Sequence, residues 1–165
     1  MTPTLFGRIQ TRIFVLIVIG GLWTLVITPF LPILPNGGFD AGLVFTEFSG
    51  DRLVDFVYEA AFSILLGVTI LGVLWELLYH LLQQFRWEKD WPTFFGAITI
   101  VNEGLLVWLL GRYGVFGSDA EAVINDQPLA FWLLFTSTWV VTFLFVNGPI
   151  RILSPRYRFR GGRLI

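Results

Sequence analysis

The chain has 165 residues, of which 55% are hydrophobic, 17% aromatic and 14% charged, and its formal net charge is −1. A soluble domain carries about 25% charged residues, and a chain this short cannot bury so much apolar surface internally. The composition therefore excludes an ordinary soluble globular domain and favours a single polytopic membrane domain over residues 1–165. The absence of cysteine excludes disulfides and thiolate metal sites.

Four segments are apolar enough to cross a bilayer as helices, which takes about 20 residues each. We expect the spans at about 13–34, 60–82, 94–112 and 128–147. The predicted fold class is all-α, a four-helix transmembrane bundle with up-down-up-down topology. Pro29, Pro32 and Pro35 predict that the first span is kinked or unwound near its end, because proline breaks the helical hydrogen-bond ladder.

The connections between these spans are short. We expect external loops at 35–58 and 114–127, and a tight cytoplasmic turn between the second and third spans. Ser118 and Glu121 have the spacing of a capping box, which predicts a short surface helix in the second external loop. Pro128 marks the start of the fourth span, and Gly148 with the proline after it marks the end.

The basic residues predict the orientation of the chain. Nine of the eleven fall on the side of the termini and two on the other side, the latter being Arg52 and Arg112. The nine are Arg8, Arg12, Arg86, Lys89, Arg151, Arg156, Arg158, Arg160 and Arg163. Because basic residues are retained on the cytoplasmic side, we expect both termini to be cytoplasmic.

Polar residues inside the second and third spans are the main candidates for function. Glu103 lies near the centre of the third span beside Asn102, where a charge costs several kcal/mol. Glu76 and His80 share one face of the second span through their i, i+4 spacing. These four residues predict either a proton or cation path, since histidine titrates near neutral pH, or polar contacts that hold helices together.

Two further charged groups lie outside the spans. Asp51, Asp55 and Glu59 recur every four residues and predict an acidic stripe, which is either a solvated face or an external strip for a cation or a basic partner. A basic cytoplasmic tail covers 151–165 and alternates arginine with aromatic residues. We expect Arg156, Arg158, Arg160 and Arg163 to contact anionic lipid headgroups or a partner, and no nucleic acid.

Three functions are compatible with this sequence. The first is a non-catalytic structural or accessory subunit of a larger membrane complex, in a hetero- or homo-oligomer; the second is a proton or cation channel or carrier. The third, a membrane-embedded enzyme, lacks a recognisable catalytic set. One histidine and no cysteine argue against a metal site, and no cofactor is expected. The predominance of arginine over lysine suggests a bacterial protein of the inner (plasma) membrane.

Overall fold

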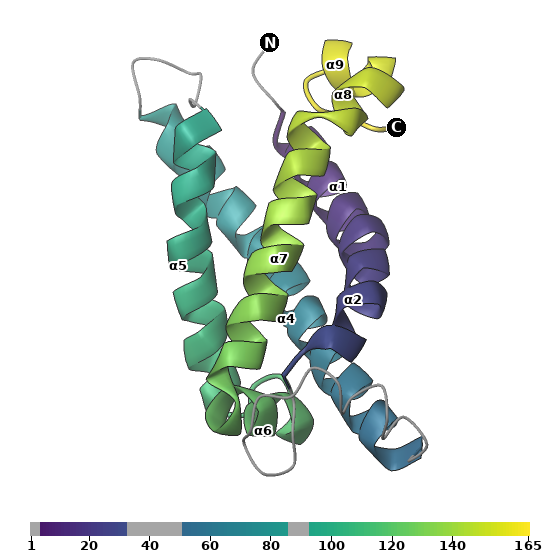
Figure 1. Cartoon of the computed structure of the whole chain (residues 1–165). Coiled ribbons are helices and arrows are strands. Elements are labelled where there is room, and N and C mark those ends of the chain that lie inside the picture. The colour runs from purple at the N-terminus through teal and green to yellow at the C-terminus, as the bar shows by residue number, and fades with distance from the viewer. Residues whose placement is uncertain (1–3, 33–50, 86–92) are drawn as a thin grey trace.

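The structure is a computed structural model that describes residues 4–32, 51–85 and 93–165. Within these ranges every regular element is a helix, which confirms the all-α prediction. Both termini lie at one end of the molecule, and the short helix α6 lies at the other end (Figure 1). Asp51 belongs to a described helix, but its side chain is not described. The expected turn that contains Arg86 and Lys89 lies outside the described residues.

The first helical segment is continuous but not uniform. It consists of α1 (Leu5–Phe14), a π-helix (Val15–Gly20), α2 (Gly21–Ile27) and a 3-10 turn (Thr28–Phe30). The hydroxyl of Thr4 accepts a hydrogen bond from the Gly7 N–H at 3.1 Å and so caps the start. The helix thus begins well before residue 13, where we expected it, and the expected disruption at Pro29 takes the form of the 3-10 turn.

The other described helices are α4 (Asp51–Gln84), α5 (Thr93–Arg112), α6 (Ser118–Asp126), α7 (Pro128–Asn147), α8 (Pro149–Leu153) and α9 (Pro155–Phe159). Three of them, α4, α5 and α7, overlap the predicted spans, and the remaining ones are short. Helix α4 starts inside the segment expected to be the first external loop. Helix α6 is the predicted surface helix, but its N-cap is Gly117, at φ 102°, with no side-chain cap. The predicted capping box is therefore not formed.

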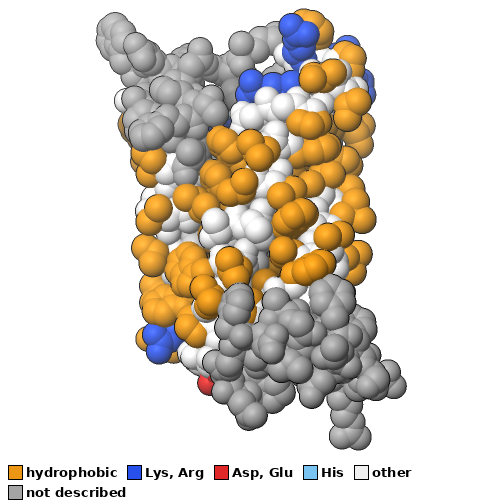
Figure 2. Space-filling model, viewed as in Figure 1, with side chains coloured by type: hydrophobic (Ala, Val, Ile, Leu, Met, Phe, Trp, Pro, Cys, Tyr) orange, Lys and Arg blue, Asp and Glu red, His pale blue; other side chains and the backbone are white. Residues whose placement is uncertain are grey.

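Three helical segments are long and apolar enough to cross a membrane. They are Leu5–Phe30, Asp55–Leu82 and Pro128–Leu153. Apolar side chains cover the shaft of the molecule, and basic side chains gather at the end that carries the termini (Figure 2). The chain is therefore a membrane-associated protein, as the composition predicts.

Helices α4 and α7 each contact both the first helical segment and α5. Helix α6 packs against α4, α5 and α7 and closes the end of the molecule opposite the termini. The buried apolar core is concentrated toward this closed end and includes Ile64, Val107, Ile124 and Phe131. Glycine allows a close approach there, since a Cβ at Gly67 would lie 2.5 Å from the ring of Phe116.

Candidate functional site

Four charged side chains from three helices meet in the interior, between α1, α4 and α5. The Nε of Arg8 donates to the Oε2 of Glu76 at 2.7 Å, and the Nη1 of Arg12 lies 3.6 Å from the Oε1 of Glu76. The Nη2 of Arg12 donates to the Oε2 of Glu103. We call Arg8, Arg12, Glu76 and Glu103 the charge network. It joins two predicted site residues, Glu76 and Glu103, through an arginine that lies between them.

The local sequence explains how the arginines reach the acids. Arg8 and Arg12 are four residues apart, so they lie on the same face of α1. Gly72 precedes Glu76 by one helical turn of α4, and a Cβ at Gly72 would lie 2.7 Å from the Nε of Arg12. Because glycine has no side chain, the stem and guanidinium of Arg12 can cross α4 at this position.

Burial makes the pairing necessary. The Glu103 side chain is 2% exposed, while those of Arg12 and Glu76 are 20% and 13% exposed. An unpaired charge at such a position is strongly unfavourable, whereas two arginines and two carboxylates together are neutral. Removing Arg12 would leave the buried carboxylate of Glu103 without its ion-pair partner, so Arg12 is the member on which the network depends most.

The network has unused hydrogen-bonding capacity. The Oε1 of Glu103 and the Nε of Arg12 are both buried and have no hydrogen-bond partner among the described residues. The second oxygen of Glu103 can therefore accept a further donor. Arginine remains protonated at any physiological pH, so both arginines of the network stay cationic.

Two tyrosines extend the network toward the end that carries the termini. Tyr79 interacts electrostatically with Glu103, Arg12 and Glu76. Tyr157 of α9 interacts with Glu76 and with Arg151, which also hydrogen bonds to it. Burial raises the pKa of the Tyr157 phenol above its ordinary value, so this group stays neutral at physiological pH.

The other two residues of the predicted polar path are placed differently. Asn102 is exposed at the middle of α5 and has no hydrogen bond within the described part of the chain. His80 is partly buried one turn beyond Glu76, and the described residues offer it no hydrogen bond or ion pair. Among the described residues, neither side chain has a hydrogen bond or ion pair to the charge network, whereas Glu76 and Glu103 are joined through Arg12.

The described part of the acidic stripe on α4 is exposed, and one of its residues lies beside α6. Asp55 and Glu59 are both exposed, and the carboxyl of Glu59 lies within hydrogen-bonding range of Asp119 on α6. The side chain of Asp51 is not described. Among the residues that the structure describes, no group of three or more histidine or acidic side chains is arranged to hold a metal ion.

Sequence reasoning missed Arg8 and Arg12 as site residues because it assigned them to the cytoplasmic flank of the first span. Their i, i+4 spacing, matched in number to the two intramembrane acids, is the signal that would have identified them. The arginines of the tail, by contrast, are exposed as expected; they are Arg156, Arg158, Arg160 and Arg163.

No protein-family model, curated protein or solved structure matches the chain significantly. The geometry of the described residues is thus the basis on which its function is argued.

Proposed function

We propose that the chain is a non-catalytic subunit of a larger membrane assembly, with α5 as a fourth span that receives a partner helix. The observation that carries this proposal is the exposure of Asn102 at the middle of α5. Its neighbours on the surface are apolar: Val101 is 55% exposed and Leu105 is 47% exposed. A primary amide facing hydrocarbon without a partner costs free energy, and in membranes such groups hydrogen bond across helices.

The charge network supports the same proposal. Its carboxylates are held by arginines of the first helix, so that three helices are cross-linked by ion pairs and hydrogen bonds. Such an arrangement stabilises one relative position of the helices. A rigid bundle with one unsatisfied amide on an otherwise apolar face fits a subunit that binds another transmembrane protein.

Purification from the native membrane in mild detergent, followed by native mass spectrometry, tests this proposal. We expect the wild-type chain to carry a larger membrane protein and Asn102→Leu to lose most of it, with unchanged helical content. Thr136→Leu is the matched control, because Thr136 is also a polar residue exposed in the middle of a helix, on α7. A wild-type chain that purifies alone, or equal retention by both variants, would contradict the proposal.

A second candidate is proton or cation conduction, favoured by the unpartnered Oε1 of Glu103. The series Glu103, Arg12, Glu76 and Arg8 leads from the middle of α5 toward the end that bears the termini. Liposomes that contain the purified chain distinguish this candidate. It requires a proton or cation flux that Glu103→Gln abolishes while circular dichroism stays unchanged; a wild-type chain without flux removes it.

We also propose that both termini face the cytoplasm of a bacterial cell, with the chain in its plasma membrane. In the predicted topology, nine basic residues fall on the side of the termini and two on the other side, which supports a cytoplasmic location of the termini. Reporter fusions after Ile165 and within 114–117 test the orientation. An external reporter at the C-terminus would exclude it without affecting the proposal about a partner helix.

A further inference from the structure

The basic tail, residues 151–165, is fixed to the start of the first helix. The N–H and the hydroxyl of Thr4 donate to the carbonyl of Gly161 at 2.8 Å and 3.2 Å. The hydroxyl of Thr11 donates to the carbonyl of Gly162 at 2.9 Å. A Cβ at Gly7 would lie 2.7 Å from the carbonyl carbon of Gly162, so a glycine is needed where the two segments cross.

The backbone of the tail turns sharply at this contact. Gly161 and Gly162 have φ angles of 62° and 78°, which other residues rarely adopt. Beyond the turn, the N–H of Leu164 donates to the side-chain oxygen of Gln10 at 2.9 Å. The tail is therefore held in a defined position by backbone and side-chain hydrogen bonds, unlike a free polybasic segment.

The arginines of the tail form no ion pair with any described acidic side chain. Residues 151–165 contain five arginines and no acidic residue. Within the described residues the ion pairs are those of Arg8 and Arg12, and none includes an arginine of the tail. Arg158 lies 5.4 Å from the ring centroid of Phe159, a cation–π contact that leaves the guanidinium hydrogens free to bind an anion.

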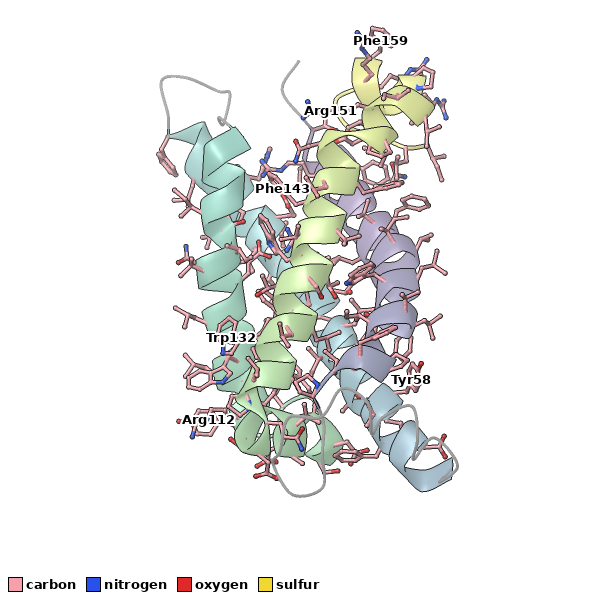
Figure 3. All side chains as sticks on the ribbon, viewed as in Figure 1. Tyr58, Arg112, Trp132, Phe143, Arg151 and Phe159 are labelled. Atoms are coloured by element: carbon pink, nitrogen blue, oxygen red, sulfur yellow. The ribbon has the colours of Figure 1, made fainter. Side chains whose placement is uncertain are left out.

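Large apolar side chains are exposed beside these arginines. Ile152 is 82% exposed, and Leu153 and Phe159 are also exposed. They extend the exposed apolar surface of α7 beyond its last turn. Figure 3 shows Arg151 and Phe159 at this end of the bundle. Side chains of both kinds at the end of a spanning helix fit the boundary between acyl chains and headgroups.

We infer that the basic tail is a binding site for the phosphate headgroups of anionic phospholipids. Its exposed apolar side chains enter the acyl region while its arginines meet the headgroups above them. The guanidinium group matches the geometry of phosphate through paired N–H donors. The contact of Gly161 with Thr4 sets the height and direction of these arginines relative to the spans, so the tail gives a positioned site.

Native mass spectrometry of the full chain in an uncharged detergent tests this inference, with phosphatidylglycerol and phosphatidylcholine of the same acyl chains as probes. We expect tighter retention of phosphatidylglycerol. Arg160→Gln should weaken that retention about fivefold, the effect of one basic residue near an anionic surface. Arg160→Lys, which keeps the charge, should preserve most of it. Circular dichroism of each variant checks the fold.

Two controls separate this inference from simpler ones. Arg112→Gln removes an exposed arginine at the opposite end of the bundle and should leave the lipid preference unchanged. Gly161→Val keeps every charge but cannot adopt the observed turn, and it should reduce the preference. Equal binding of both lipids, equal effects of Arg112→Gln and Arg160→Gln, displacement by millimolar inorganic phosphate, or no effect of Gly161→Val would each overturn the inference.

Discussion

The two ends of the bundle are held together by different forces. Near α6, apolar side chains such as Ile64, Ile124 and Phe131 are buried against one another. Near the termini, the interior contains the charge network and the hydrogen bonds of the tail. Apolar packing tolerates small changes in position, whereas ion pairs require defined geometry. Shape complementarity therefore closes one end, and charge complementarity selects which helices meet at the other.

Breaking the charge network should produce the largest effect on stability. Arg12→Met leaves the buried carboxylate of Glu103 without a partner, and we expect a loss of about 3 to 5 kcal/mol in the free energy of unfolding. Titration of the purified protein from mild detergent into dodecyl sulfate, followed by circular dichroism, measures it. The double variant with Glu103→Leu should recover much of the loss, and a single variant as stable as wild type would refute the role of the network.

A cavity in the apolar end should come next. Ile124 of α6 is 1% exposed and belongs to the apolar core. Ile124→Ala should therefore lower the free energy of unfolding by about 2 to 4 kcal/mol, measured by the same titration. Val115→Ala, at an exposed position in the neighbouring segment, should change stability by less than about 0.5 kcal/mol. If the two substitutions have equal effects, this end does not depend on close packing.

A methyl group at Gly72 tests whether Arg12 packs closely against the backbone of α4. Gly72→Ala places a Cβ against the guanidinium of Arg12, and we expect a cost of about 1 to 3 kcal/mol from overpacking. In the background of Arg12→Ala the same methyl group should be tolerated. Equal costs in the two backgrounds would show that Arg12 does not cross α4 at Gly72.

The smallest effect is expected at a single hydrogen bond between the first helix and α7. The indole Nε1 of Trp23 donates to the hydroxyl of Ser137 at 3.1 Å. Trp23→Phe removes the donor, and such bonds within membrane proteins contribute about 0.6 kcal/mol on average. A double-mutant cycle with Ser137→Ala isolates this contribution, and a coupling energy indistinguishable from zero would show that the bond does not stabilise the bundle.

Much of the fold is predictable from the sequence because apolar length alone defines spanning helices. The predicted limits 94–112 and 128–147 agree closely with α5 and α7. The first helix begins at Leu5, ahead of the expected span 13–34, and so includes two arginines that the prediction placed before the span. Arg8 and Arg12 pair with Glu76 and Glu103, which lie 68 and 91 residues away along the chain, so no local pattern shows these contacts.

Details that depend on contacts distant in the sequence could not be predicted. The π-helix at Val15–Gly20 has no local signal that we recognised. The sequence predicted a basic tail but no contact for it, whereas Gly161 and Gly162 form the turn that joins the tail to α1. The exposure of Asn102 could not be separated from the burial of Glu103, because the rotation of α5 is set by its neighbours.

The order of synthesis gives the charge network a consequence for biogenesis. The arginines at positions 8 and 12 leave the ribosome long before either acid has been made. Until α4 and α5 arrive, the first helix carries two charges that disfavour its entry into lipid. Neutralisation of the first helix therefore depends on helices that follow it in the chain, and the tail then adds the hydrogen bonds to Thr4 and Thr11.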